Sequence, residues 1–144
     1  MLPIQFNSYK VKIQNRPFNS EQGIQFSYTA AITLYDNNKK EIAFFEKGYI
    51  DAETLYKRID QGKDLILDQS YCENFSIQEY RKLRNIEPDK VIYLHNFSAY
   101  QAVFDGKEAI DFSYCDFGNH YKNFEQAVFL NCKVNIHHCN FRKG

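Results

Sequence analysis

The chain has 144 residues, with 18 basic and 18 acidic side chains and therefore no formal net charge. Duplex-binding domains usually carry a basic excess and protein mimics of DNA an acidic one, so this balance disfavours both classes and predicts no nucleic-acid partner. The 13 Phe and 11 Tyr residues, against only 6 Gly and 3 Pro, favour an ordered chain with a β bias over a disordered one.

The sequence carries no targeting signal that we recognise. No apolar run approaches the roughly 20 residues that a membrane helix needs, and residues 1–6 lack the basic start and long apolar stretch of a signal peptide. We therefore predict a cytoplasmic protein with no membrane partner, in which Cys72, Cys115, Cys132 and Cys139 stay reduced. The abundance of Asn, Lys, Ile, Phe and Tyr would suit an AT-rich bacterial genome.

The first 50 residues predict an antiparallel sheet. Apolar and polar residues alternate over residues 4–13 and again over 24–34, which places each apolar set on one face of a strand. Residues 36–40 read Asp-Asn-Asn-Lys-Lys, and Asx residues tolerate tight turns. Residues 41–50 are therefore expected to return as the partner strand of a hairpin.

A first short helix is predicted from its ends. Asp51 can cap a helix over residues 52–61, and Gly62 can terminate it. Leu55 and Ile59 are four residues apart and should lie on its buried face.

A second helix is predicted from Ser76 to about residue 85, before Pro88. Ser76 and Glu79 have the spacing of a capping box, in which each side chain can satisfy the other's backbone donor. The buried stripe of this helix is expected to consist of Tyr80, Leu83 and Ile86.

From residue 64 onward, small or apolar side chains occur in pairs two positions apart, and the pairs recur every five residues. Neither the 3.6-residue period of a helix nor the two-residue period of a strand explains this spacing. Slips at 118–123 and 135–138 interrupt it. The pairs expected to point inward are Leu65 with Leu67, Ser70 with Cys72, Phe75 with Ile77, Ile92 with Leu94, Phe97 with Ala99, Ala102 with Phe104, Ile110 with Phe112, Cys115 with Phe117, Ala127 with Phe129, Cys132 with Val134 and Cys139 with Phe141.

The recurrent unit is a small residue, a variable residue and a large apolar residue, as in Cys115-Asp116-Phe117. In this the chain resembles the pentapeptide-repeat proteins, most clearly over 110–141 and more loosely over 64–77 and 90–105. The resemblance implies a right-handed quadrilateral β-helix, in which four five-residue faces make one coil and the small and large residues point inward. Each coil would bury its face against its neighbours.

We therefore predict a mainly β protein with two regions. Residues 1–62 are expected to form an N-terminal antiparallel β cap region with one helix, and residues 63–144 the β-helix, interrupted by a helix at about 77–86. The alternative is an ordinary antiparallel α+β domain. The chain stops directly after a repeat unit, and an open coil exposes core and backbone groups. This predicts either a homodimer through the C-terminal end of the β-helix or the N-terminal part of a longer protein.

Reactive side chains cluster near residues 132–139, where Cys132, His137, His138 and Cys139 include the ligand types that zinc prefers. There is no tight Cys-x-x-Cys pair, however, and both cysteines occupy the small inward position, where Cys packs as a compact hydrophobe. No phosphate loop, nucleophile elbow or metalloprotease helix is present. We therefore expect no metal, no other cofactor and no enzymatic activity, with a metal- or thiol-dependent enzyme built on this cluster as the alternative.

Exposed aromatic and basic residues are the best candidates for binding. The densest basic segment, residues 80–84, is flanked by acidic residues and is expected to be a solvated helix face. Tyrosines outside the inward positions would form either a protein interface or stacking ladders. The candidate interaction surface consists of Tyr93, Tyr100, Tyr114, Tyr121, Arg81, Lys82 and Arg84.

The predicted function is thus a non-enzymatic scaffold or assembly module for a protein partner that the sequence does not identify. A second alternative is an N-terminal targeting domain of a larger protein. Some pentapeptide-repeat proteins protect topoisomerases by imitating DNA, but that role requires a negative outer face, which the zero net charge disfavours.

Overall fold

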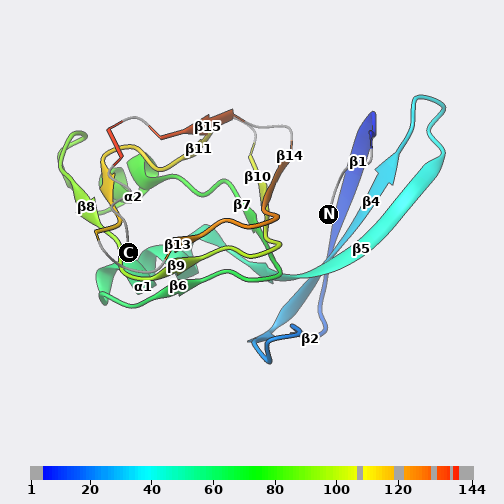
Figure 1. Ribbon diagram of the computed structural model, residues 1–144, viewed down its shortest axis with the longest axis horizontal. Coiled ribbons are helices and arrows are strands. Elements are labelled where there is room, and N and C mark those ends of the chain that lie inside the picture. The colour runs from blue at the N-terminus through cyan, green and yellow to red at the C-terminus, as the bar shows by residue number, and fades with distance from the viewer. Residues whose placement is uncertain (1–4, 107–108, 119–121, 131–132, 137, 140–144) are drawn as a thin grey trace.

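The computed structural model describes residues 5–106, 109–118, 122–130, 133–136 and 138–139. Within them the protein is mainly β with two helices, as predicted (Figure 1). In chain order the elements are β1 (Ser8–Gln14), β2 (Phe18–Asn19), β3 (Gln25–Phe26), β4 (Tyr28–Tyr35), β5 (Glu41–Ile50), α1 (Ala52–Asp60), β6 (Leu65–Ile66), β7 (Ser70–Glu73), α2 (Ile77–Leu83), β8 (Ile92–Tyr93), β9 (Phe97–Ser98), β10 (Val103–Asp105), β11 (Ala109–Asp111), β12 (Cys115–Asp116), β13 (Lys122–Asn123), β14 (Val128–Leu130) and β15 (Lys133–Asn135).

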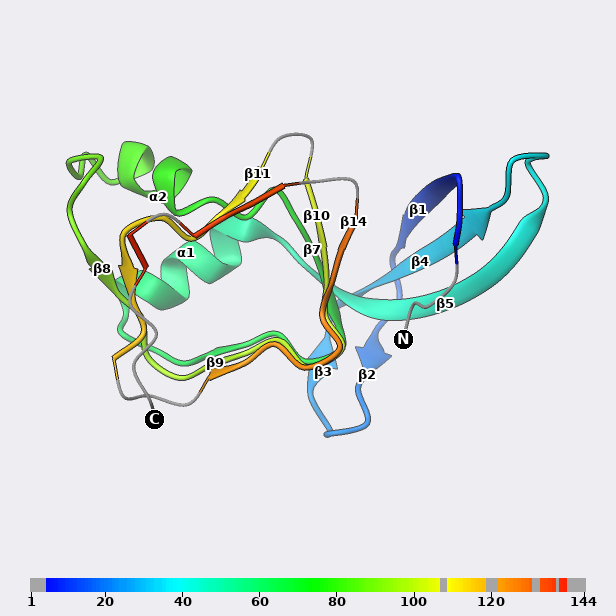
Figure 2. The ribbon, with the colours of Figure 1, turned by 45° about the horizontal axis from the view of Figure 1, so that its top comes forward.

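Strands β1, β4 and β5 form a twisted antiparallel ribbon that projects from the rest of the molecule (Figures 1 and 2). The predicted hairpin is confirmed, because β5 spans residues 41–50 and pairs with β4. The carboxylate of Asp36 closes the turn by accepting hydrogen bonds from the amides of Asn38 at 2.8 Å and Lys40 at 2.9 Å. The predicted strand from residue 24 is divided in two, since β3 pairs with β2 and β4 begins at Tyr28.

One face of β4 packs against the second half of the chain. Its Ala30, Ile32 and Leu34 are buried in one apolar cluster with Tyr71, Val103 and Leu130. The carboxylate of Asp105 joins the same elements through hydrogen bonds, since Tyr9 donates to one of its oxygens at 2.6 Å and Tyr71 donates to the other. The ribbon is therefore held to β7 and β10 by both apolar packing and a shared carboxylate.

Helix α1 confirms the prediction made from its ends. The Asp51 carboxylate accepts hydrogen bonds from the backbone amide of Thr54 at 2.8 Å and from its hydroxyl at 2.6 Å, which satisfies a free donor of the first turn. Leu55 is buried, and Ile59 packs partly buried against the core. Gly62 has a φ of 65°, the left-handed conformation that commonly follows a helix.

Helix α2 begins after Ser76, whose hydroxyl accepts a hydrogen bond from the amide of Glu79 at 3.1 Å. The prediction that Leu83 belongs to its buried stripe is wrong, because this side chain is 51% exposed. The buried residues are Ile77, Tyr80 and Arg81, whose spacing of three and four positions defines a single helix face. Leu83 falls outside that face.

Beyond α1, short strands pair in parallel with strands that follow later in the chain. β9 lies between β6 and β13, and β10 lies between β7 and β14 (Figure 2). β8 pairs with β12, and β11 pairs with β15. Residues 48–50 of β5 pair in parallel with β7, so the ribbon and one ladder form a single six-stranded sheet in the order β1-β4-β5-β7-β10-β14. The division of the chain after residue 62 stays a prediction, and this sheet crosses it.

The inward-facing pairs are confirmed as far as residue 117. Both members of each of the first eight predicted pairs, from Leu65 to Phe117, are buried. Ala127 and Phe129 pack partly buried against the same core. The prediction for Val134 is wrong: it is exposed, because β15 has a partner strand on one side only within the described part of the chain. Cys132 and Phe141 lie outside the described residues.

Phe112 occupies the centre of the core. Its ring centre lies between 5.3 and 6.2 Å from the centres of five other rings, in tilted or edge-to-face arrangements that aromatic pairs prefer. These rings belong to Phe75, Phe97, Phe104, Phe117 and Phe124. The five-residue repeat therefore produces one continuous aromatic core.

Three glutamines at turns between ladders form a row that we call the glutamine ladder. Gln69, Gln101 and Gln126 all have a left-handed backbone, with φ of 58°, 55° and 58°. The side-chain amide of Gln69 donates to the side-chain oxygen of Gln101 at 3.0 Å, and that of Gln101 donates to Gln126 at 2.8 Å. The backbone amide of Glu21 donates to the Gln69 side-chain oxygen at 2.8 Å. These bonds offset the cost of a left-handed backbone at non-glycine residues.

Gly48 is required by a close approach of Phe26. A Cβ atom added at Gly48 would lie 2.1 Å from a ring carbon of Phe26, which is itself buried in the core. We therefore expect Gly48→Ala to lower the free energy of unfolding by about 1–3 kcal/mol, the usual cost of overpacking. Urea denaturation would measure this. The double variant Gly48→Ala/Phe26→Leu should lose less stability than the two single changes combined, and strict additivity would contradict the steric explanation.

Candidate functional site

The structure separates the residues of the predicted interaction surface. Tyr93 is 71% exposed, and Lys82 is also exposed. Tyr100 and Tyr114 are half-buried, and Tyr121 lies outside the described residues. The predicted surface is therefore present only in part.

Arg81 is not a surface residue, so the prediction of a solvated face at this position is wrong. Its side chain is 1% exposed. Nε donates to the carbonyl of Lys90 at 2.9 Å, and Nη2 donates to the carbonyls of Ser113 and Tyr114, each at 2.9 Å. The guanidinium also lies 5.8 Å from the centre of the Tyr114 ring. Backbone carbonyls thus replace part of the water around this cation, whereas the buried Nη1 has no hydrogen-bond partner in the described part of the chain.

Arg81 anchors the segment that leads from α2 to β8. Three exposed apolar side chains lie at or next to its ends, Leu83 at the end of α2, Val91 just before β8 and Tyr93 in β8, and Lys82 beside Leu83 is also exposed. We call these four residues the α2–β8 surface. Because Arg81 binds the carbonyl of Lys90, the residue before Val91, the exposed side chains are carried by a backbone that is tied to the core.

Sequence reasoning missed Leu83 and Val91 as surface residues. Val91 had a detectable signal, because Ile92 was predicted to point inward and neighbouring strand residues point to opposite faces. Leu83 had none, because an apolar residue in a helix is normally assigned to the core.

Tyr114 belongs to a stack rather than to an open surface. Its ring lies 4.5 Å from the ring of His138, with an angle of 17° between the planes. Both residues have a left-handed backbone, with φ of 52° and 55°, so the two stacked rings extend from turns of similar backbone conformation. With Arg81 also against the Tyr114 ring, this tyrosine fits a stacking ladder better than an interface.

Arg84 is committed to carboxylates of α1. It forms ion pairs with Asp60 at 2.8 Å and with Glu53 at 3.2 Å, and its guanidinium lies 5.2 Å from the centre of the Tyr80 ring. Hydrogen bonds from Arg84 and then from Tyr80 hold the pKa of Asp60 below its usual value. Arg84 therefore joins the two helices and offers little free positive charge to a partner.

The Cys/His cluster near residues 132–139 is only partly described. Cys132 and His137 lie outside the described residues, His138 stacks on Tyr114, and the Cys139 thiol donates to the carbonyl of Phe112. Among the described residues, no three His, Cys, Asp or Glu side chains are grouped so that they could hold a metal ion. The alternative of a metal- or thiol-dependent enzyme gains no support from these contacts.

The buried cysteines should be unreactive. Burial raises the pKa of the Cys72 and Cys115 thiols, and it also raises that of Cys139. Since the thiolate is the nucleophile, we expect Cys72 and Cys115 to react with a thiol reagent at least about tenfold more slowly in the native protein than in urea. The ratio of the native to the denatured labelling rate should not rise between pH 7 and pH 9, because the raised pKa keeps the folded thiols protonated while the exposed thiols ionise. Peptide mapping by mass spectrometry would check both statements, and rapid labelling of either residue at pH 7 would contradict them.

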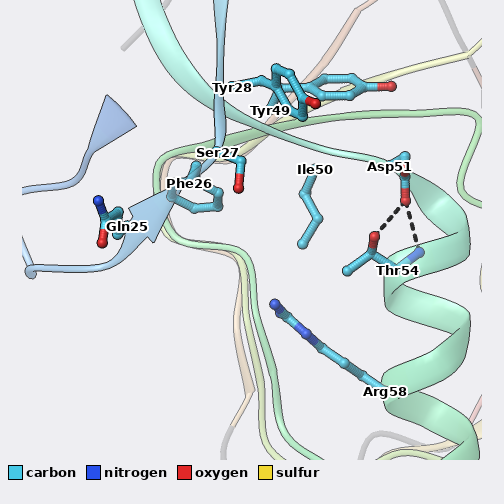
Figure 3. A pocket seen from close by; sticks show the side chains of 9 residues that line it. All are labelled: Gln25, Phe26, Ser27, Tyr28, Tyr49, Ile50, Asp51, Thr54 and Arg58. Carbon is cyan, nitrogen blue, oxygen red and sulfur yellow. Dashed lines mark hydrogen bonds between the residues drawn. The ribbon is translucent and has the colours of Figure 1, made fainter. Parts of the chain in front are cut away.

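A half-open pocket of about 210 Å³ lies between the base of the ribbon and α1 (Figure 3). Tyr28 and Tyr49 form its upper wall, and the Arg58 side chain extends along its lower side (Figure 3). The Asp51 carboxylate in this pocket is already used by the helix cap. The space is below the roughly 300–1,000 Å³ of ordinary ligand sites, and few polar groups converge on it. It does not define a function.

Comparison with known proteins gives no relative: no protein-family model, no curated protein sequence and no solved structure matches this chain. The resemblance to pentapeptide-repeat proteins therefore remains a prediction. Neither helix in the described part of the chain is long and apolar enough to cross a lipid bilayer.

Proposed function

We propose that this protein is a non-enzymatic protein-interaction scaffold, built as a pentapeptide-type right-handed β-helix with an N-terminal β cap. The parallel ladders, the buried pairs spaced five residues apart and the repeated left-handed turns support this fold. Neighbours in the glutamine ladder are 32 and then 25 residues apart. The longer first interval contains α2 and the segment that follows it, so we interpret α2 as an insertion in the proposed coil. The slip at 118–123 falls in the second interval.

The α2–β8 surface is the observation that carries the functional proposal. Leu83 is 51% and Tyr93 is 71% exposed, and Val91 is exposed between them in the sequence. Tyrosine and aliphatic side chains of this kind bury large apolar areas when a partner protein covers them. The insertion interrupts the repeat and yet is fixed by a buried arginine, which suits a segment that presents side chains to a partner.

A site-specific crosslinking experiment tests this function. A photoreactive amino acid placed at Tyr93 should crosslink one protein in cells of the source organism, and that protein is then purified. Tyr93→Ser and Leu83→Ser should each weaken its binding about tenfold, because each removes an apolar contact. Phe44→Ser is the matched control, since Phe44 is also exposed, at 54%, but lies on the ribbon. If Tyr93→Ser and Leu83→Ser bind the partner as tightly as Phe44→Ser does, the proposal is contradicted.

We further propose a homodimer through the C-terminal end of the coil. Within the described residues β13, β14 and β15 each have a parallel partner on one side only. Phe124 and Phe129 are only partly buried there, whereas the preceding Phe97 and Phe104 are fully buried. Native mass spectrometry of tag-free protein should show a dimer that Phe129→Glu dissociates, and a monomer at all concentrations would contradict this proposal.

A further inference from the structure

The opposite edge of the six-stranded sheet is formed by β1. This strand is seven residues long and pairs only with β4 among the described strands. Every second residue of an edge strand directs its N–H and C=O groups away from the sheet, where an additional strand can pair with them. The outer edge of β1 is therefore a template for an extended segment.

One face of this edge carries two positive charges. Lys10 and Lys12 are exposed and lie on the same face of the ribbon, because they are two residues apart in a strand. The register places Lys10 opposite Thr33, and Lys12 opposite Ala31. Ala31 lies in turn opposite Glu46 of β5, and the carboxylate of Glu46 forms an ion pair with Arg16. The Lys10 ammonium lies 5.7 Å from the Tyr35 ring, so neither lysine has a carboxylate partner among the described residues.

The other face of β1 is apolar. Tyr9 and Val11 are half-buried on the cluster beneath the ribbon, and Ile13 is exposed. A strand added beside β1 would place alternate side chains next to Val11 and Ile13 on this face. Its remaining side chains would lie next to Lys10 and Lys12 on the opposite face.

The charges decide which kind of strand can bind. If a second copy of the chain paired antiparallel through its own β1, residues opposite one another would share a face, so lysines would face lysines. Like charges directly opposite in a sheet are destabilising, and acidic side chains in the same positions are stabilising. We infer that the outer edge of β1 binds an extended segment of a partner protein in which acidic residues alternate with apolar ones.

This inference does not depend on the α2–β8 surface, which lies on elements outside the ribbon. Binding of an acidic strand is also a different role from protecting the edge against aggregation. Lysines on an edge strand discourage pairing between identical chains, but that role requires no affinity for an acidic strand. Main-chain hydrogen bonds would supply much of the binding, and the lysines would select the sequence.

Peptide binding to the full-length chain provides the test. The probe is a peptide of the length of β1 in which glutamate and valine alternate, capped at both ends. One control peptide has lysine in place of glutamate, and another has the same composition as the probe with the glutamates in one block. Titration is followed by fluorescence anisotropy, and hydrogen exchange reports the backbone amides of residues 8–14.

The probe should bind, and it should protect amides of β1 from exchange. Lys10→Glu/Lys12→Glu should weaken binding at least about tenfold, and Lys10→Gln/Lys12→Gln should weaken it less. Phe44→Ser and Tyr93→Ser should leave the affinity within about twofold, because neither residue lies at this edge. Thermal melts show whether each variant is folded.

Three results would overturn the inference. The first is that the block peptide binds with the same affinity as the alternating probe, which would mean that charge alone attracts the probe. The second is binding that survives charge reversal in a folded variant, and the third is no binding of the alternating probe. If the peptide binds as expected but no protein crosslinks at Tyr93, only the proposed function is overturned.

Discussion

Replacing Phe112 with alanine is expected to lower the free energy of unfolding by about 3–5 kcal/mol, the usual cost of emptying a buried phenylalanine site. The side chain is fully buried and contacts the rings of five other phenylalanines, which lie between residues 75 and 124 of the chain. The surrounding rings are themselves packed in the core and have little freedom to fill the cavity. Urea denaturation followed by circular dichroism would measure the change.

Phe44→Ala is the matched control for Phe112→Ala. The same atoms are removed, but Phe44 is 54% exposed on the ribbon, so the expected change is within about 0.5 kcal/mol. If Phe112→Ala lowers the free energy of unfolding by less than about 1 kcal/mol, the aromatic core is not tightly packed around this ring.

Replacing Arg81 with methionine is expected to lower the free energy of unfolding by about 2–4 kcal/mol. Methionine fills much of the space, but it leaves the buried carbonyl of Ser113 and the half-buried carbonyl of Lys90 without the guanidinium donor. The carbonyl of Tyr114 also loses this donor but keeps a hydrogen bond from the Ile92 amide at 2.9 Å. Burying a carbonyl without a hydrogen bond costs more than the removed bond contributed. Arg81→Lys should recover only part of the loss, because a single ammonium cannot reproduce the geometry of the guanidinium fork.

A local measurement distinguishes this role of Arg81 from a general loss of stability. Hydrogen exchange in Arg81→Met should accelerate first in residues 84–91, between α2 and β8, under conditions in which the core around Phe112 stays protected. Lys82→Met is the control, since Lys82 is the exposed neighbour and should change stability by less than about 0.5 kcal/mol. Uniform acceleration throughout the chain would contradict the anchoring role.

The parts of the fold that depend on local chemistry could be predicted from the sequence. Asp36 at the turn, and Asp51 and Ser76 at the helix starts, act within a few residues. The five-residue period was also sufficient to identify the buried pairs as far as Phe117, because the inward positions of a repeat are set by its own spacing.

The candidate site could not be predicted in the same way, because its decisive contacts are distant in sequence. Arg81 reads as one cation among several on a short helix, and the Ser113 carbonyl that accepts its hydrogen bond is 32 residues away. Once Arg81 is placed in the core, the helix face that remains outside includes Leu83. The error at Leu83 thus follows from the error at Arg81, and a polar residue determined the orientation of the helix.

The hydrogen bonds of the glutamine ladder run in one direction. A backbone N–H can only donate, so the amide of Glu21 turns the side-chain oxygen of Gln69 toward itself and the nitrogen toward Gln101. Gln101 is oriented in turn and donates to Gln126. The amide dipoles are therefore aligned head to tail, and each polarises the next. The loop between β2 and β3 thereby sets the polarity of a hydrogen-bond chain whose last nitrogen belongs to Gln126, so a group that extends the row there must offer an acceptor.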